Sequence, residues 1–244
     1  MRKLMMVMGA SMLAAAPVVS ADILGVGATV GYWDADYSGE ASKGNDRVDL
    51  ERDLNLSSDS NANLTAYFEH PVPVLPNVRL AYTRTKQSGN GQLDVTYDGI
   101  TAGANVRSEL ELEQLDVTLY YEILDNWVNL DLGLTVRDFS GELLVQNRND
   151  TSQFSETKAD AVLPLVYVAT RFDLPFTGVS VGGDANAITY DGDSVYDFNV
   201  YGQYEMSLLQ LRAGYRQISL DYDDGDDNLD IELSGPFVSA GLRF

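Results

Sequence analysis

The last ten residues of the chain, 235–244, alternate between two kinds of side chain, with a period of two residues from 238 onward. One face carries Val238, Ala240, Leu242 and Phe244, and the other carries Ser239, Gly241 and Arg243. Successive side chains of a β-strand point to opposite faces, so this segment predicts a strand that is apolar on one side and small or polar on the other. Such a strand suits a wall between lipid and water, but it also suits the edge of a soluble β-sandwich.

The same alternation recurs along the chain. It predicts ten strands, at 24–33, 63–69, 78–82, 115–122, 128–137, 161–172, 179–190, 196–206, 209–216 and 238–244. The clearest pair is 115–122 with 128–137, in which an unbroken aliphatic face opposes a polar and charged one. The segment 161–172 is apolar on both faces, and placing Arg171 inside would put Val166, Val168 and Phe172 outside.

The connections between the predicted strands alternate in length in most cases, the exception being a tight turn predicted at 190–193. Long polar loops are predicted at 37–60, 83–107, 140–158 and 221–230, with 93–97 as a candidate strand extension, and short turns at 70–77, 124–126, 173–177 and 207–208. Outer-membrane barrels have long external loops and short periplasmic turns, whereas a soluble sandwich has no reason to sort its loops this way. We therefore predict an all-β, antiparallel, up-and-down transmembrane β-barrel of about ten strands, with eight or twelve as alternatives.

Membrane-spanning helices are not expected, because no run of about 20 apolar residues follows residue 21. A closed barrel is then the fold that pairs every backbone group in lipid. Aromatic residues near the strand ends predict two interfacial girdles. The periplasmic girdle comprises Phe68, Trp127, Phe172, Phe176, Tyr204 and Phe244, and the external girdle Tyr32, Tyr82, Phe139 and Tyr196.

The N-terminal segment 1–21 has the parts of a secretory signal peptide. Arg2 and Lys3 precede an apolar stretch that is too short to span a bilayer, and a small-residue cleavage site ends at Ala21. The predicted barrel domain is therefore 22–244, exported through the inner membrane to the cell outer membrane. The chain contains no cysteine, which excludes disulfides and thiolate chemistry.

The chain is strongly acidic. Its formal net charge is −21, and removal of 1–21, which carries Arg2 and Lys3, makes the charge −23. Such a surface repels phosphate backbones, so no nucleic-acid partner is expected. The expected partners are outer-membrane lipid and lipopolysaccharide, with divalent cations at acidic loops.

Several short motifs carry a resemblance to a known family. They are Phe68-Glu69-His70-Pro71 with Pro73 and Pro76-Asn77, Tyr120-Tyr121-Glu122 with Asp125-Asn126, Asp131 with Gly133, and the pair Gly182-Gly183. Together they resemble a functionally uncharacterised family of small Gram-negative outer-membrane barrels named for a Gly-Gly motif. The resemblance implies a fold and a location, and it carries over no catalytic or binding residue. The closing strand likewise resembles C-terminal strands that end in Phe, which implies that the barrel-insertion machinery reads Phe244.

Catalytic and metal chemistry have few candidates. The sole histidine, His70, begins a proline-rich turn on the predicted periplasmic side, where we expect it to brace the turn and not to act as a catalytic base. With one histidine and no cysteine, we predict no metal site of that kind and no cofactor. A candidate cation-binding loop comprises Asp221, Asp223, Asp224, Asp226, Asp227 and Asp230. Its spacing is not that of an EF-hand, and a solvated loop is the simpler interpretation.

The inward faces of the predicted strands carry charges of both signs. The basic residues are Arg79, Arg137, Arg171, Arg212, Arg216 and Arg243, and the acidic residues are Glu69, Asp116, Glu122, Asp131, Asp173, Asp184, Asp197 and Glu205. Buried charges need partners, and a ten-stranded barrel is only slightly wider than the eight-stranded kind that side chains fill. We predict an Arg–carboxylate network that largely fills the lumen, with Arg243 paired to Glu69, Asp173 or Glu205.

These features favour a non-enzymatic outer-membrane barrel with a structural or surface-contact role. A narrow channel or transporter for ions or small solutes is the alternative. A membrane-surface hydrolase or acyltransferase is disfavoured, because the external segments contain no histidine to serve as a base.

Overall fold

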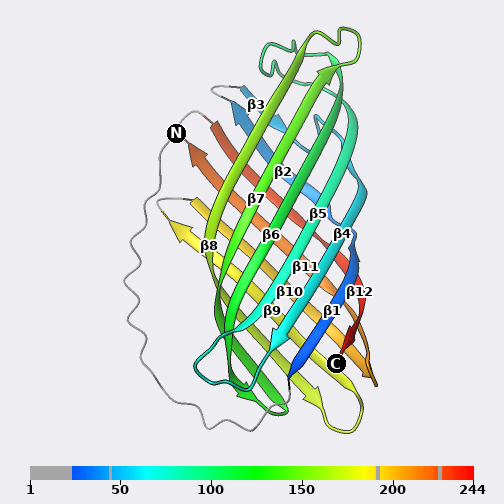
Figure 1. Cartoon of the computed structure of the whole chain (residues 1–244). Coiled ribbons are helices and arrows are strands. Elements are labelled where there is room, and N and C mark those ends of the chain that lie inside the picture. The colour runs from blue at the N-terminus through cyan, green and yellow to red at the C-terminus, as the bar shows by residue number, and fades with distance from the viewer. Residues whose placement is uncertain (1–23, 44–45, 191–192, 225–226) are drawn as a thin grey trace.

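In the computed structural model, the described residues are 24–43, 46–190, 193–224 and 227–244, so the predicted signal peptide lies outside them. Their regular structure is all β-strand (Figure 1). The strands are β1 (Gly25–Trp33), β2 (Asp36–Lys43), β3 (Asp46–Asp49), β4 (Leu56–Glu69), β5 (Asn77–Gln92), β6 (Asn105–Asp125), β7 (Val128–Asn147), β8 (Phe154–Leu174), β9 (Val179–Tyr190), β10 (Asp193–Met206), β11 (Leu209–Asp224) and β12 (Asp227–Arg243). No helix in the described part of the chain is long and apolar enough to cross a membrane.

Ten of these strands form a closed antiparallel barrel in the order β1-β4-β5-β6-β7-β8-β9-β10-β11-β12. The ring closes between β1 and β12, where Thr29 lies opposite Gly241 and Val30 opposite Ala240. This closure confirms the predicted fold, the strand number of ten and the pairing of the first strand with the last. The other two strands form a hairpin that continues the wall above β1, because β2 pairs with the first half of β12, next to the stretch that pairs with β1, and β3 pairs with β2.

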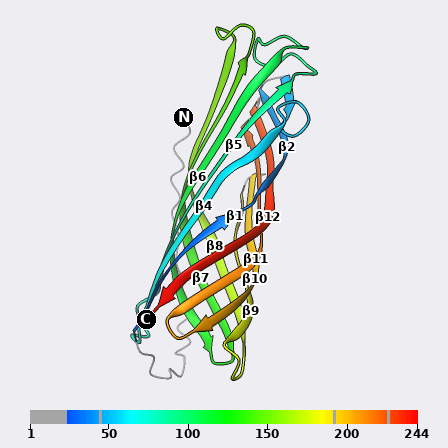
Figure 2. The ribbon, with the colours of Figure 1, turned by 90° about the vertical axis from the view of Figure 1, so that its right-hand side faces the viewer.

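The lower part of the barrel has the two-sided pattern of a wall in lipid. Val30, Leu134 and Val166 point outward and are exposed by 58%, 47% and 57%. Inward neighbours such as Thr118 and Thr135 are buried. Val166, Val168 and Phe172 point outward, which is the arrangement predicted if Arg171 lies inside. The start of β1 and the end of β12 both lie at the lower end of the barrel (Figures 1 and 2), as an even number of strands requires.

Most of the predicted long loops are strand, so this part of the prediction was wrong. β5 and β6 occupy most of 83–107, β7 and β8 most of 140–158, and β11 and β12 most of 221–230. The segment 37–60 contains β2, β3 and the beginning of β4. The extended strands of the β5–β8 side rise above the rest of the barrel (Figures 1 and 2).

The physical reason is visible in β6, whose two faces exchange character along its length. Its outward residues are charged up to Glu113 and apolar from Leu115, whereas its inward residues turn from apolar to polar between Leu112 and Gln114. The alternation therefore continues without a break, but its sense is inverted in the upper part. An apolar inner face and a charged outer face are what surrounding water favours, so the inversion marks the upper limit of the lipid-facing belt.

The upper part of the barrel encloses an apolar core. The core comprises Trp33, Ala35, Tyr37, Ala41, Val48, Leu50, Leu54, Leu93, Tyr97, Ile100, Val106, Leu110, Leu143, Val145, Ile218, Ile231 and Leu233. The candidate strand extension at 93–97 is instead a loop that inserts Leu93 and Tyr97 into this core. Phe139 is also misplaced by the prediction. It does not join the external girdle but lines a small apolar cavity of about 30 Å³ beside Trp33, because its parity on β7 is that of the inward residues.

Candidate functional site in the barrel lumen

A buried group of two arginines and two aspartates crosses the middle of the lumen. Arg137 of β7 donates hydrogen bonds from Nε and Nη2 to Asp116 of β6, both at 2.7 Å, and from Nη2 to Asp197 of β10 at 2.5 Å. Arg216 of β11 donates from Nε and Nη2 to the same Asp197 at 3.0 and 2.8 Å. Exposed fractions run from 1% for Arg137 to 8% for Arg216. We call these four residues the central cluster.

The central cluster is electrically neutral and is held by the walls on several sides. Its two cations balance two carboxylates, which is the condition under which buried charge is tolerated. Arg216 also donates to Thr83 Oγ1 of β5 at 3.0 Å, and its guanidinium lies 4.9 Å from the ring centroid of Trp33 in β1. Because β6 and β7 are well separated from β10 and β11 in the ring, the cluster links distant parts of the wall.

Below the central cluster the charged residues are paired less tightly. The ion pairs are Arg79–Asp184 at 3.8 Å, Arg243–Glu69 at 3.7 Å, Arg243–Glu205 at 3.4 Å and Arg171–Asp173 at 2.9 Å. Of these only the last has the short distance of a strong charge-assisted hydrogen bond. We call the residues of these pairs, with Arg212, Glu122 and Asp131, the lower layer.

Two residues of the lower layer have no oppositely charged partner at short range. Arg212 donates to Gln203 and lies 4.5 Å from the ring centroid of Tyr201, and no carboxylate of the described residues is within 4 Å of it. Asp131 likewise has no hydrogen-bond donor for its side chain and no cation within 4 Å in the described part of the chain. Glu122 accepts a hydrogen bond from Asn77 at 3.0 Å.

The structure places all of the charged residues predicted for the lumen on inward faces. Four of them form the central cluster and the remainder form the lower layer, so the predicted set is divided into a tight and a loose group. Arg243 pairs with Glu69 and Glu205, two of the three partners proposed for it from the sequence.

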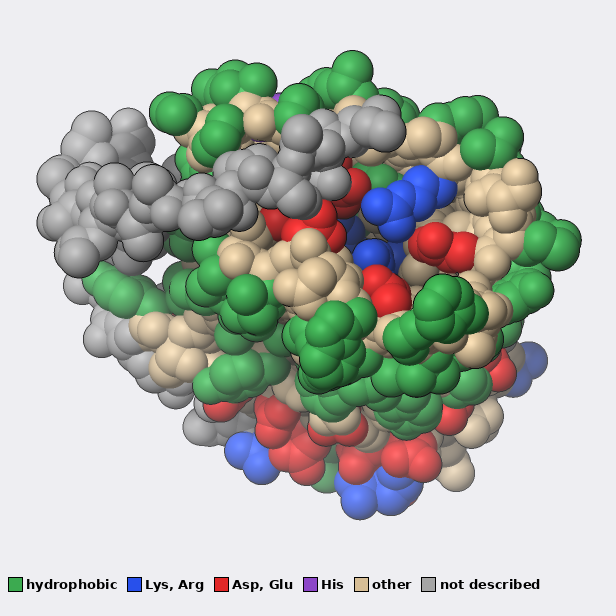
Figure 3. Space-filling model, turned by 90° about the horizontal axis from the view of Figure 1, so that it is seen from below, with side chains coloured by type: hydrophobic (Ala, Val, Ile, Leu, Met, Phe, Trp, Pro, Cys, Tyr) green, Lys and Arg blue, Asp and Glu red, His purple; other side chains and the backbone are tan. Residues whose placement is uncertain are grey.

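Two polar cavities lie within this charged lumen. The first, of about 80 Å³, is bounded by the lower layer, and we call it the periplasmic cavity after the predicted orientation of the barrel. The second, of about 70 Å³, reaches the central cluster through Asp116, Asp197 and Arg216. The two cavities have in common the lining residues Thr29, Thr65, Arg79, Asp184, Tyr201 and Arg212. Seen from below, arginines and carboxylates line a hollow in the lower face (Figure 3).

Uncharged side chains complete the lumen, and the sequence analysis assigned them no role. Tyr120 donates to Glu69 at 3.0 Å. The guanidinium carbon of Arg79 lies 5.7 Å from the ring centroid of Tyr167. Gln210 is 1% exposed and donates from Nε2 to Gln203 at 2.7 Å, while its Oε1 accepts no hydrogen bond. Strand parity places Tyr120 and Gln210 inside, but it does not indicate which side chains meet across the ring.

His70 is engaged within its own turn, as the sequence analysis expected. The backbone N–H of Val72 donates to His70 Nδ1 at 3.2 Å. Because Nδ1 is the acceptor, Nε2 carries the proton and donates to the carbonyl oxygen of Pro76 at 3.2 Å. The backbone N–H of His70 donates to Asn77 Oδ1 at 3.0 Å. Both ring nitrogens are therefore occupied by the turn.

The acidic segment 221–230 is not the solvated loop that the sequence predicted. Its first residues end β11 and its last residues begin β12, so that Asp221 lies opposite Asp230 in the ladder. Asp226 and the side chains of Asp223, Asp224 and Asp227 lie outside the described residues. Within the described residues no group of three or more His, Cys, Asp or Glu side chains could hold a metal ion. Cation binding by this segment stays a prediction.

A closed antiparallel ring of ten strands with an apolar outer wall and a charged lumen defines an outer-membrane-type β-barrel. Among solved structures, the chain is similar to the outer membrane protease OmpT from Escherichia coli, with a TM-score of 0.52 and 10% identity over 96% of this chain and 99% of that chain. It is also similar to the translocator domain of the autotransporter NalP from Neisseria meningitidis, with a TM-score of 0.46 and 10% identity over 92% and 90% of the two chains. These likenesses concern the fold.

No family model matches the sequence, and no curated protein matches it. The resemblance to the family with the Gly-Gly motif therefore stays a prediction.

Proposed function

We propose that this protein is a non-enzymatic outer-membrane β-barrel whose lumen does not let solutes pass through and whose role is structural or one of surface contact. The observation that carries the proposal is the central cluster, in which four charged side chains with exposed fractions of 1% to 8% are hydrogen-bonded across the lumen. An ion passing this level would have to separate them. Breaking a buried pair by removing one partner costs about 3–5 kcal/mol, so a resting conduction path through the cluster is unfavourable.

A second obstacle supports the same proposal. Above the central cluster, the apolar core occupies the upper barrel, where a cavity of about 30 Å³ is lined in part by Trp33, Leu112 and Ile218. Most of the lining of this cavity is apolar, although Thr83, Thr85 and Gln114 also line it, so it offers few hydrogen-bond partners to an ion and its water. An ion would therefore meet a charged obstacle followed by an apolar one.

Recording in planar bilayers tests the closed lumen. We expect purified, heat-modifiable protein to show no steady conductance, whereas an open porin reconstituted in the same way conducts. A large and steady conductance of the wild-type protein would overturn the proposal.

The second candidate function is a narrow conduit, and the two polar cavities favour it. Together they lead from the periplasmic end to the central cluster, and both are lined by charged side chains. If the central cluster and the apolar core open transiently, the recordings should show brief events of small amplitude in place of silence.

Enzymatic activity is disfavoured by the bonding of His70. A general base needs a free lone pair directed at the reacting group, and both ring nitrogens of His70 are used within the proline-rich turn. The outer membrane protease OmpT shares only 10% sequence identity with this chain, so its protease activity cannot be assigned to this protein. Peptidase, esterase and acyl-transfer assays on the refolded protein should be negative, and turnover that survives further purification would refute this part of the proposal.

We further propose that residues 1–21 direct export, that the barrel resides in the outer membrane among lipid and lipopolysaccharide, and that the insertion machinery reads Phe244. The exposed aromatic side chain of Phe244 and its two backbone hydrogen bonds to Val26, at 2.8 and 3.1 Å, support the last point because they put the terminus at the closing seam. Replacing Phe244 with Ala should slow assembly into native outer membranes, measured by pulse-chase with heat-modifiable migration. An unchanged assembly rate would argue against this role.

A further inference from the structure

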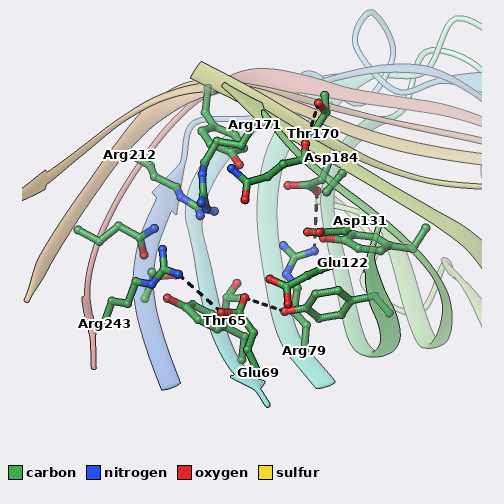
Figure 4. A pocket seen from close by; sticks show the side chains of 18 of the residues that line it. Thr65, Glu69, Arg79, Glu122, Asp131, Thr170, Arg171, Asp184, Arg212 and Arg243 are labelled. Carbon is green, nitrogen blue, oxygen red and sulfur yellow. Dashed lines mark hydrogen bonds and ion pairs between the residues drawn. The ribbon is translucent and has the colours of Figure 1, made fainter. Parts of the chain in front are cut away.

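The charges around the periplasmic cavity are sorted by wall. Arg171, Arg212 and Arg243 come from β8, β11 and β12 and lie on one side, whereas Glu69, Glu122 and Asp131 come from β4, β6 and β7 and lie on the other (Figure 4). The pair of Arg79 and Asp184 lies in the wall that this cavity shares with the second polar cavity. The cavity thus has a cationic wall, formed by Arg171, Arg212 and Arg243, that faces an acidic wall. Because Arg171 and Arg243 also pair with Asp173, Glu69 and Glu205, the charges left without an oppositely charged partner among the described residues are Arg212 on one wall and Asp131 on the other.

This arrangement is not the one that internal packing alone would favour. In the central cluster, cation and carboxylate are in contact at 2.5 to 3.0 Å. In the cavity below, Arg212 has no carboxylate and Asp131 no cation within 4 Å in the described part of the chain. Separated charges in a space of low dielectric are costly unless something lies between them.

Gln210 is a second and independent sign of a missing partner. It lines the periplasmic cavity, it is 1% exposed, and its Oε1 accepts no hydrogen bond from the protein. A buried amide oxygen that remains unsatisfied costs about 1–3 kcal/mol. A ligand or water with a hydrogen-bond donor in the cavity would remove this cost.

The size and access of the cavity limit what can bind. At roughly 10–15 Å³ for each water molecule, a cavity of about 80 Å³ holds a handful of waters or a small organic molecule of similar size. The charged hollow in the lower face indicates entry from the periplasmic side (Figure 3), and the central cluster bounds the lumen above.

We propose that the periplasmic cavity binds a small zwitterion of about the size of glycine, with its carboxylate on the cationic wall and its ammonium on the acidic wall. A simple anion would pair with Arg212 but would leave Asp131 without a cation, and a simple cation would leave Arg212 without an anion. A dipolar ligand satisfies both walls at once. This inference goes beyond the proposed function and does not depend on whether the lumen conducts.

Isothermal titration of the full-length mature protein in detergent micelles tests the inference, with glycine, acetate and methylamine as probes. Glycine should bind at least about tenfold more tightly than either half-molecule. Arg212→Gln and Asp131→Asn should each weaken glycine binding by about tenfold or more. Arg84→Gln, on the outer face of the same barrel, should leave binding unchanged.

Each other outcome counts against the inference. Acetate binding as tightly as glycine would show a plain anion site, and equal binding of methylamine would show a plain cation site. Undetectable glycine binding to protein with the heat-modifiable migration of the folded barrel would overturn the proposal, as would binding that survives both substitutions. If Arg212→Gln does not fold, Asp131→Asn alone decides, since it leaves the cationic wall intact. Conductance of the wild type would overturn the closed lumen without affecting this site.

Discussion

Asp197 is the residue on which the charged lumen depends most. It is 2% exposed and accepts hydrogen bonds from both arginines of the central cluster. Neither its neighbours in sequence nor the parity of β10 reveals this role, because Arg137 and Arg216 come from β7 and β11. The importance of the residue is a property of contacts across the ring.

Replacing Asp197 with Asn should destabilise the barrel strongly. The substitution keeps the shape of the side chain but leaves Arg137 and Arg216 with one carboxylate between them, so we expect a loss of about 3–5 kcal/mol in the free energy of unfolding. Urea titration in lipid vesicles measures this loss. Glu142→Gln, which removes only an exposed pair with Lys158 at 3.7 Å, is the matched control and should change little. Equal effects of the two variants would contradict the assigned role.

At the scale of one element, β7 shows the same inversion as β6. Its outward residues are aliphatic from Leu130 to Val136 and polar or charged at Asp138, Ser140 and Glu142. The register places Ser140 between Glu113 of β6 and Asp160 of β8, so the charged belt continues from strand to strand. One strand therefore contributes to a lipid-facing wall and to a water-facing wall.

Arginine substitutions on β7 should distinguish these two walls. Leu132→Arg puts a charge near the middle of the lipid-facing belt and should cost about 2–4 kcal/mol. Ser140 lies beyond Val136, opposite a carboxylate on each neighbouring strand. Ser140→Arg should therefore be neutral or slightly stabilising, because the new guanidinium faces opposite charge. Unfolding in vesicles compares the two variants, and a similar penalty at both positions would place the lipid boundary elsewhere.

At the scale of the whole molecule, the closed ring separates three environments. Lipid-facing residues cover the lower outer wall, paired charges occupy the lower lumen, and an apolar core fills the upper barrel. The two tryptophans report on different environments, since Trp127 is 66% exposed at the lower end and Trp33 is fully buried inside.

Quenching by brominated lipid should separate the two tryptophans. In Trp33→Phe protein the remaining Trp127 should be quenched strongly, because it lies at the membrane interface. In Trp127→Phe protein the remaining Trp33 should be quenched weakly, because the barrel wall shields it. Tryptophan emission in vesicles of increasing bromolipid content measures both. Strong quenching of Trp33 would contradict its position inside the barrel, next to the guanidinium of Arg216.

The mistaken long loops and the misplaced Phe139 have one physical cause. Periodicity reports that one side of a strand differs from the other, but it does not report which environment lies on each side. Leu112 and Leu115 are both leucines of β6, yet the first faces the upper apolar core and the second faces lipid. The polar outer face of an inverted stretch therefore resembles a loop, and local pattern alone puts Phe139 on the wrong face.

The sequence by itself determined the class of fold, the inward set of charged residues and the bracing of His70, because each follows from local alternation, turn chemistry and the pairing demands of lipid. It left the strand number open between eight, ten and twelve, and ring closure fixes it at ten. Only the tertiary structure decided which charges pair, which of them stay apart around the periplasmic cavity, and where the lumen is obstructed. Those features depend on contacts between residues that are distant in the chain, such as Arg216 with Thr83 and Trp33, and ring closure alone brings them together.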